Sequence, residues 1–468
     1  MSERPFPRDP QRLPHRLWAI LAIAATIGLV LRIAAAQGDY WLDEAWSAVF
    51  AREAATPGDV FFAINHDNNH FLNTLWLQLV GWGSPPILGR ALSIACGTAS
   101  IVVAGLIGAR RGLRGAAFAA LLFAVAPILV TYGSEARGYA PMLLALLCAI
   151  RIVDRELFGA PVAHAPVLIG IAALIGMLAH ASMLFGVAAL TGWVAIEQGR
   201  RTRPRAAALA TLRLMGRAVA AVIAVLLVVA AGAVASPDGF RMGSIAPFSW
   251  PAFVDALDHM VGWTIGWPPL LIGPWLLLFL FLPFLLRRAP LLRERIGFHL
   301  LAILGLPLLV ALLEADNSAF PRYYLLSAVA LLLLVAEMAA VRGRAARLLF
   351  AWIMIGSLTL DIGLVANRRG DPGAAIDAIS LAAPGGGSVM VEAARDSAVL
   401  EAAAAQRAYP LTATDSCADT RFIFLAGNGT APFPLAALRC GAAFQPIAGS
   451  DIYGLSGQAW QLYERVER

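Results

Sequence analysis

The 468-residue chain is 59% hydrophobic, and only 14% of its residues are charged. Soluble domains carry about 25% charged residues, so this composition, with a mean hydropathy of +0.71, excludes an ordinary soluble protein and indicates a polytopic membrane protein. The net charge of +6 does not indicate nucleic-acid binding. Its arginines fall in short runs between apolar segments, which is the pattern that membrane topology produces.

An apolar run over 17–36 follows a polar, basic N-terminal tail and is long enough to cross the bilayer as an uncleaved helix. Ten further spans are expected at 88–109, 115–132, 139–153, 164–180, 182–197, 217–236, 269–286, 296–314, 322–341 and 347–366. The sequence therefore predicts an all-α polytopic fold with about eleven transmembrane helices. An odd number of spans places the two termini on opposite sides of the membrane.

The loops between these spans alternate in arginine content, which supports the topology. If the N-terminus is cytoplasmic, the cytoplasmic segments are 110–114, 151–156, 199–217, 287–295 and 342–347, and each is rich in arginine. The opposite loops are poorer in arginine and richer in acidic, aromatic and histidine residues. Candidate chemistry therefore gathers on the extracytoplasmic side.

The last hundred residues change character and predict a small extracytoplasmic α/β domain over 367–468, after a transmembrane domain over 1–366. The expected elements there are a short strand within 384–394, an amphipathic helix over 392–406 and a second strand within 421–429. Cys417 and Cys440 lie in this region. A disulfide between them and two free thiols are equal alternatives for an extracytoplasmic domain.

Two adjacent carboxylates, Asp43 and Glu44, follow the first span within the sequence GDYWLDEAW (38–46). The aromatic residues around them are typical of a turn held at the lipid–water boundary. A carboxylate held at that depth is a candidate general base for a lipid-linked substrate. The structural alternative is that both acids stabilise the first turn of a short helix.

A dense polar cluster at 65–70 leads into the segment 70–82, which is apolar on one face and too short to cross a membrane. This segment predicts an interfacial, juxtamembrane helix. The candidate substrate-binding residues of the cluster are His66, Asp67, Asn69 and His70. Sugar or phosphate binding and helix capping are favoured over metal binding, because the spacing fits no standard zinc pattern.

Two arginines, Arg137 and Arg322, lie in outer loops against the general trend. Guanidinium groups match phosphate oxygens bidentately, so both are candidates for binding an anionic phosphate. The alternatives are an ion pair between Arg137 and Glu135, and an aromatic interface anchor at Arg322. Further candidates for substrate contact are Glu135, Tyr139, His180 and Tyr323. For His180, helix capping is the alternative.

The order of these motifs resembles the GT-C membrane glycosyltransferases, in particular the protein O-mannosyltransferase-like branch that includes the lipid A aminoarabinose transferases (glycosyltransferase family 39-like). The resemblance covers roughly residues 15–340 and rests on WLDEAW (41–46), HDNNHFLNTLWLQLVGWGSPPILGRALSIACG (66–97), YGSEARGYA (132–140), LAHASMLFG (178–186) and PRYYLLSAV (321–329). The family commonly has two prolines after the histidine, whereas Phe71 and Leu72 follow His70 in this chain, which puts the role of His70 in question.

The resemblance implies an inverting glycosyltransferase in the bacterial plasma membrane. It would move a sugar from a polyprenyl-phosphate donor to an acceptor hydroxyl of the envelope, on a lipid, glycan or protein, at the extracytoplasmic face. Asp43 would be the general base, Glu44 beside it would be a catalytic residue that orients the acceptor or sugar, and Arg137 and Arg322 would bind the donor phosphate. The remaining candidates would contact the sugar or acceptor. No cofactor is implied, although a divalent metal stays an alternative.

Two other functions compete with this interpretation. A transporter or flippase for lipid-linked sugars would explain the spans, but it needs polar groups through the membrane midplane, whereas the polar groups gather on one side. A non-catalytic envelope scaffold is the second alternative. The chain contains no nucleotide-binding loop, nucleophile elbow or zinc-protease motif.

Overall fold

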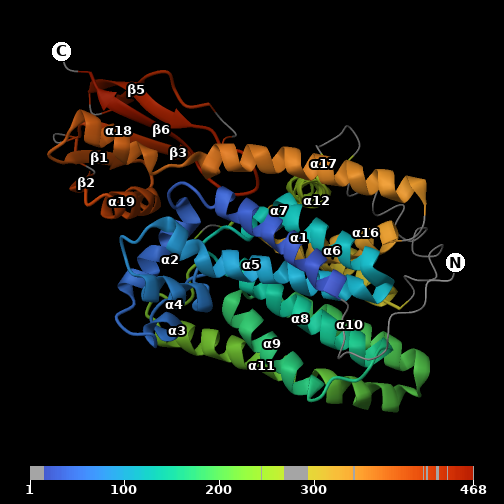
Figure 1. Ribbon diagram of the computed structural model, residues 1–468. Coiled ribbons are helices and arrows are strands. Elements are labelled where there is room, and N and C mark those ends of the chain that lie inside the picture. Colours follow the sequence, from blue (N-terminus) through green and yellow to red (C-terminus); the bar gives the residue numbers. More distant parts are fainter. Residues whose placement is uncertain are drawn as a thin grey trace.

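The computed structural model describes residues 15–466 with short gaps. The gaps are residues 244, 268–272, 274–293, 341–342, 415, 418–419, 428, 430–431 and 440. Figure 1 shows a bundle of long helices with a sheet at one end, called the sheet end below. The other end of the bundle is called the opposite end.

The long helices of the bundle run between these two ends, and shorter ones pack among them. Its elements are α1 (His15–Ala35), α5 (Pro86–Gly108), α6 (Gly112–Val125), α7 (Pro127–Tyr132), α8 (Tyr139–Phe158), α9 (Ala165–Ala179), α10 (Met183–Arg201), α11 (Pro204–Ala235), α12 (Trp250–Ile265), α14 (Ile296–Leu300), α15 (Leu306–Leu312), α16 (Leu325–Ala340) and α17 (Arg344–Asn367). Three short helices lie at the sheet end, namely α2 (Leu42–Glu53), α3 (Asp59–Phe62) and α4 (Phe71–Val80). The short helix expected over 70–82 is therefore present as α4.

Within the described residues, five helical segments are long and apolar enough to cross a membrane. They are His15–Ala35, Pro86–Val125, Pro204–Ala235, Pro321–Ala340 and Ala346–Gly370. The protein is therefore a multi-pass membrane protein, whereas the number of about eleven spans stays a prediction. The expected span over 269–286 lies outside the described residues, apart from Gly273.

The helices at the centre of the bundle are more deeply buried than those at its rim. In the span that contains α16, 78% of the apolar window is buried, whereas the corresponding share is 22% in α11 and in α17. A helix that is apolar all round and buried belongs to a core, so α16 is central. The large exposed apolar side chains of α11 form a surface suited to lipid.

Two expected spans have different bounds in the structure. The span expected over 115–132 is broken between α6 and α7, because Pro127 has no N–H to continue the helix and its ring clashes with the preceding turn. The span expected over 217–236 starts earlier, because α11 begins at Pro204, a residue favoured at a first helical position. Much of the loop expected over 199–217 is therefore helical.

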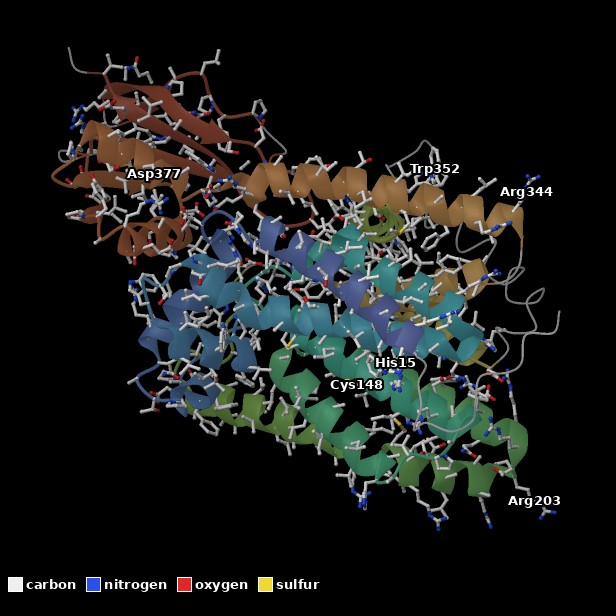
Figure 2. The ribbon with its side chains drawn as sticks, viewed as in Figure 1. His15, Cys148, Arg203, Arg344, Trp352 and Asp377 are labelled. Atoms are coloured by element: carbon white, nitrogen blue, oxygen red, sulfur yellow. The ribbon has the colours of Figure 1, made fainter. Side chains whose placement is uncertain are left out.

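The arginine-rich segments and the sheet lie at different ends of the bundle. Figure 2 shows Arg203 and Arg344 at the opposite end and Asp377 at the sheet end. This separation agrees with the expected alternation of loops. Which end faces the cytoplasm stays a prediction.

The C-terminal region forms a six-stranded sheet in the order β2-β1-β3-β6-β5-β4. Its elements are α18 (Ala374–Ala382), β1 (Gly387–Val391), α19 (Ser397–Gln406), β2 (Leu411–Thr414), β3 (Phe422–Gly427), β4 (Ala437–Arg439), β5 (Ala442–Ser450) and β6 (Ala459–Arg465). β1 pairs in parallel with β2 and β3, and the other pairs are antiparallel. The expected helix and both expected strands are present as α19, β1 and β3. Cys417 is disulfide-bonded, and Cys440, its expected partner, lies outside the described residues.

The sheet region is anchored on the bundle beside α2. Val399 and Ala402 of α19 pack in one apolar cluster with Ala45 and Ala48 of α2. Arg369, in the turn after α17, is buried and donates to the carbonyl oxygen of Ala35 at 2.6 Å and to Ser134 Oγ at 2.7 Å. The C-terminal region is thus attached to the segments that carry the candidate site.

Candidate active site

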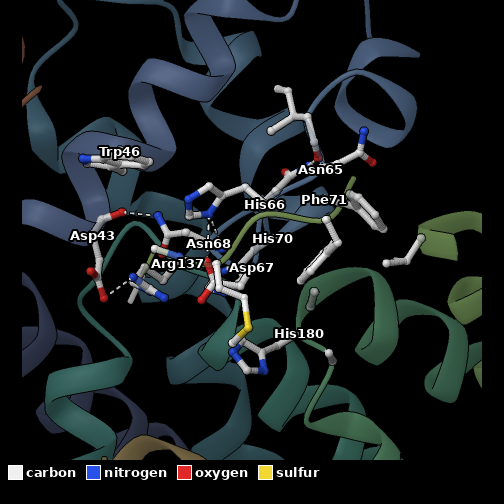
Figure 3. A pocket seen from close by; sticks show the side chains of 18 of the residues that line it. Asp43, Trp46, Asn65, His66, Asp67, Asn68, His70, Phe71, Arg137 and His180 are labelled. Carbon is white, nitrogen blue, oxygen red and sulfur yellow. Dashed lines mark hydrogen bonds and ion pairs between the residues drawn. The ribbon is translucent and has the colours of Figure 1, made fainter. Parts of the chain in front are cut away.

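A cavity of about 420 Å³ lies at the sheet end and brings together polar residues from six separate parts of the chain. Its polar lining includes Asp43, His66, Asp67, Asn69, His70, Arg137, Tyr139, His180, Arg322 and Tyr323. An apolar wall from α9 and α11 includes Met177, Leu178, Val225, Leu226 and Val229. Figure 3 shows Asp43, His70, Arg137 and His180 around this space. A cavity with one polar and one apolar wall suits an amphipathic ligand.

Asp43 lies in the first turn of α2, where a carboxylate is favoured by the helix dipole. Its side chain faces the cavity and forms ion pairs with Arg137 and Arg322; the Arg322 Nη1 to Asp43 Oδ2 distance is 3.2 Å. Asn68 donates to the main-chain carbonyl of Asp43 at 2.9 Å and fixes the start of the helix. The structure thus joins three sequence-predicted residues, a carboxylate and two guanidinium groups.

Glu44 does not line the cavity, which corrects the expectation that it acts together with Asp43 on the substrate. Successive side chains on a helix are about 100° apart, and Glu44 is turned into the core, where it is fully buried. Arg90 donates to its two carboxylate oxygens at 2.8 and 2.6 Å, and Ala136 N–H donates to Oε1 at 2.7 Å. Burial raises the pKa of Glu44, but the ion pair with Arg90 outweighs it and leaves the pKa below its usual value. Glu44 therefore ties α2 to the loop before α8.

Glu135 is also buried outside the cavity lining. The expected alternative of an Arg137–Glu135 ion pair is not formed, since Arg137 pairs with Asp43. The Glu135 carboxylate instead accepts a hydrogen bond from Ser456 and lies 3.6 Å from Arg369 Nε. Burial raises the pKa of Glu135 above its usual value. Glu135 thus connects the Arg137 loop to the C-terminal region and does not line the cavity.

Gly138 allows the Arg137 loop to approach the end of α9. A Cβ atom at this position would lie 1.7 Å from the carbonyl oxygen of Ala179, so no other residue fits without displacing the backbone. This close approach brings Arg137 and Tyr139 next to His180; the Tyr139 and His180 ring centroids are 4.5 Å apart. The glycine therefore helps to assemble the site although it has no side chain.

His70 and His180 form a pair of neutral imidazoles whose ring centroids are 4.6 Å apart. His70 Nδ1 accepts from Gly138 N–H and His180 Nδ1 accepts from Ser182 N–H, both at 3.1 Å. Burial and the nearby Arg137 lower the pKa of His70 well below its usual value and lower the pKa of His180 to about 3. A neutral imidazole that accepts at Nδ1 carries its proton at Nε2. Both histidines therefore retain an N–H donor, and His180, the C-cap residue of α9, accepts from the N–H of the residue before α10.

The polar cluster at 65–70 is largely satisfied by internal hydrogen bonds. Asn69 Nδ2 donates to the carbonyl oxygens of Val60 and Ile64 at 2.7 and 2.8 Å. His66 Nδ1 lies 2.8 Å from Asp67 Oδ1. In the described part of the chain, no group of three or more histidine, cysteine, aspartate or glutamate side chains is arranged to hold a metal ion. The cluster therefore forms an internally hydrogen-bonded wall of the cavity.

The two cavity arginines have spare hydrogen-bonding capacity. Within the described residues, Nε of Arg137 and Nε of Arg322 are buried without a hydrogen-bond partner. Arg322 also packs over the Phe320 ring, with its guanidinium carbon 4.4 Å from the ring centroid, and 5.7 Å from that of Tyr323. These ring contacts accompany the ion pair with Asp43, and the alternative of an aromatic anchor at the membrane interface stays a prediction. A phosphate placed beside these groups would meet two cations with unused donors.

Some residues of the cavity were not identified from the sequence. The segment 240–243 pairs with the 65–70 loop through hydrogen bonds from Arg241 N–H to Asn65 O at 2.8 Å and from Asp67 N–H to Arg241 O at 3.0 Å. Arg395, from the C-terminal region, lines the same cavity. Its carbonyl oxygen accepts from Trp46 Nε1 at 3.0 Å. No local pattern marks Arg395, because its place depends on the docking of the sheet region.

The comparisons with known proteins support the fold. No family model and no curated protein matches the chain. Among solved structures, the chain is similar to the crystal structure of ArnT from Cupriavidus metallidurans bound to undecaprenyl phosphate. The identity is 14%, the TM-score is 0.52, and the match covers 95% of this chain and 97% of that chain. At this identity the likeness shows the fold alone. The chain therefore has the GT-C glycosyltransferase-like fold that the order of its motifs predicts.

Proposed function

We propose that this protein is an inverting membrane glycosyltransferase that moves a sugar from a polyprenyl-phosphate donor to a hydroxyl of an envelope acceptor. The observation that carries the proposal is the position of Asp43 in the cavity, between the guanidinium groups of Arg137 and Arg322. A single displacement needs a base for the acceptor and cations for the leaving phosphate. These three side chains supply both.

The donor is positioned by the two walls of the cavity. Its phosphate binds the guanidinium groups of Arg137 and Arg322, which line the cavity, and its polyprenyl chain lies along the apolar wall from α9 and α11. The neutral His70 and His180 donate N–H bonds to the phosphate or the sugar without adding charge. The undecaprenyl phosphate named for the ArnT crystal structure supports this class of donor.

The reaction then follows from the arrangement of charges. The Asp43 carboxylate takes the proton of the acceptor hydroxyl, whose oxygen attacks the anomeric carbon from the side opposite the phosphate. The bond between that carbon and the phosphate oxygen breaks with its electron pair on the phosphate, where Arg137 and Arg322 stabilise the added charge. A bound phosphate also competes with Asp43 for the two arginines, which frees the carboxylate to act as the base. The configuration at the anomeric carbon is inverted.

We infer the extracytoplasmic face of the bacterial plasma membrane as the location of this chemistry. The arginine-rich ends of the helices lie away from the cavity, as Figure 2 shows for Arg203 and Arg344. Under the positive-inside rule, the end with the cavity faces outward. A polyprenyl-phosphate sugar is a donor suited to that compartment, because no nucleotide sugar is needed at the site.

The test uses the full-length protein in liposomes with a panel of polyprenyl-phosphate sugars and a crude envelope extract as acceptor. We expect release of polyprenyl phosphate that requires acceptor and falls by about 10²–10⁴-fold in Asp43→Asn. The matched control is Asp255→Asn, which changes an exposed aspartate, 71% accessible at its side chain, that does not line the cavity. No release with any donor by a folded wild-type protein, or transfer of intact donor across the bilayer, would refute the enzyme and favour a scaffold or a flippase.

A further inference from the structure

A second groove, of about 480 Å³, adjoins the catalytic cavity. It lies between α2, the segment 241–243 and the C-terminal region, where a 3₁₀ turn (Ala394–Asp396) leads into α19. The groove and the cavity share Trp46, His66, Met242, Gly243 and Arg395. The two spaces are therefore neighbours separated by these residues.

The groove reaches the candidate base from the side away from the donor. Trp46 lies three residues after Asp43 on α2, so the two side chains are on the same face of the helix. None of the residues of α9 and α11 that form the apolar donor wall lines the groove. A ligand in the groove would thus approach Asp43 past Trp46, while the lipid-linked donor occupies the other wall.

The lining of the groove has the chemistry of a binding surface for an acidic saccharide. Three arginines, Arg52, Arg241 and Arg395, line the groove together with Glu53 and Glu401. Arg241 pairs with Asp238 at 3.8 Å, whereas Arg395 forms no ion pair within the described residues and is the cation left for an acidic ligand. The Arg52 ion pair with Glu401, at 3.5 Å, accounts for one of these cations.

Arg395 and Trp46 lie at the junction between the groove and the cavity. Arg395 is exposed and lies where groove and cavity meet. The indole N–H of Trp46 is satisfied by the Arg395 carbonyl, and the half-buried ring packs against Phe50 and His66, with centroids 5.5 and 5.1 Å away. The exposed part of the ring is what remains for a sugar. The aromatic surface and the cation therefore lie side by side.

We propose that this groove binds the acceptor, and that the acceptor is a saccharide carrying an acidic group, with Trp46 contacting a sugar ring and Arg395 and Arg241 contacting the acid. This inference rests on the proposed glycosyltransferase function. It gives the C-terminal region a role in acceptor binding, because Arg395 belongs to that region and lines both the groove and the cavity. The acid is a carboxylate or a phosphate, and both offer oxygens that guanidinium groups bind in the same way.

The experiment measures transfer from a polyprenyl-phosphate sugar to three oligosaccharides of equal ring number: neutral, uronic-acid-containing and phosphorylated. We expect wild-type protein to prefer one of the two acidic acceptors, and the preferred one identifies the acid. Arg395→Gln should raise the acceptor KM about tenfold, as the loss of one charge-assisted hydrogen bond predicts, with the donor KM unchanged. Arg395→Lys should recover part of that loss.

The control is Arg421→Gln, which removes an exposed arginine that pairs with Glu464 on the sheet, outside both spaces. It should leave both KM values unchanged. Equal use of neutral and acidic acceptors, or an unchanged acceptor KM in Arg395→Gln with normal turnover, would overturn the acceptor groove while leaving the glycosyltransferase intact. Absence of turnover in the wild type would overturn both proposals.

Discussion

The two ends of the bundle each contain a buried cluster of arginines and carboxylates, but the clusters differ in what they leave unused. At the opposite end, Arg295 contacts both oxygens of Asp154 at 2.8 Å and also pairs with Glu337. Arg110 adds a second cation to Asp154 at 2.9 Å. The guanidinium nitrogens of Arg295 are all engaged, although Glu337 Oε2 is buried without a hydrogen-bond partner among the described residues. The cluster is closed in the sense that its central arginine has no donor left for a ligand.

At the sheet end, the cluster around Asp43 is open. Its carboxylate lines a cavity, and its two arginines keep Nε–H groups without a partner among the described residues. A closed cluster joins helices, whereas an open one has charge and donors left for a ligand. Residue types alone therefore do not distinguish a structural cluster from a reactive one. The distinction comes from access to a cavity and from hydrogen-bonding groups left for a ligand.

The largest effect is expected at the closed cluster. Arg295→Ala leaves Asp154 and Glu337 buried with less compensation and should cost about 3–5 kcal/mol of unfolding free energy. The check is the unfolding midpoint in detergent, together with turnover per folded molecule, which should stay at the wild-type value. A variant that keeps its stability but loses turnover would contradict the assignment of this cluster to structure.

At the open cluster, a substitution should reduce activity strongly and stability only slightly. Arg322→Ala removes one cation from the phosphate and should lower kcat/KM by about 10²–10³-fold, with a small change in stability. Arg322→Lys keeps the positive charge but loses the planar guanidinium group. Its kcat/KM should therefore lie between the values of the wild type and Arg322→Ala. Steady-state kinetics and the unfolding midpoint, measured on the same preparations, test this; a loss of stability as large as that of Arg295→Ala would refute the distinction.

The histidine pair predicts a dependence of stability on pH. The folded pKa of His180 is about 3, against about 6.5 in the unfolded chain. Because the folded pKa is lowered, the stabilisation by neutral His180 is complete above pH 6.5 and is lost as the pH falls toward 3. The loss of unfolding free energy amounts to about 2 kcal/mol at pH 5. The unfolding free energy should therefore fall between pH 7 and pH 5, and it should fall less in His180→Gln. Equal slopes in both proteins would show that His180 is not buried in its neutral form.

The smallest effect is expected at a partly exposed ion pair of the sheet region. Arg407 contacts Asp39 and Asp377, and its side chain is 26% exposed. Solvent screening limits such pairs to about 1 kcal/mol or less, so Arg407→Ala should shift the unfolding midpoint by little. A loss as large as that expected for Arg295→Ala would mean that the number of ion pairs matters more than their burial.

Three residues that the sequence singled out individually, Asp43, Arg137 and Arg322, line the cavity. Asp43 was identified because a carboxylate beside aromatic residues at the end of a span is unusual, and Arg137 and Arg322 because arginines in outer loops run against the topology. Glu44 was assigned to the substrate because it is adjacent in sequence, whereas helix geometry turns neighbouring side chains apart. The roles of the first three stay proposals.

Other features depend on contacts that no local pattern contains. The contacts of Arg369 and Arg395 with the bundle arise from tertiary docking across more than 300 positions, as in the Arg369–Ala35 and Trp46–Arg395 hydrogen bonds. The break at Pro127 was in principle predictable, because proline interrupts a helix wherever it lies in the interior. The apolar run around it concealed this signal.

The partners in the site are widely separated along the chain, and this has a consequence for biosynthesis. Asp43 and Arg322 are 279 positions apart, and Glu135 and Ser456 are 321 positions apart. Contacts at such separation form late, after the intervening helices have been inserted. A nascent polypeptide still on the ribosome holds the Asp43 carboxylate long before it has both of its cations, so a prematurely terminated product that lacks residue 322 would carry an incomplete site into the membrane.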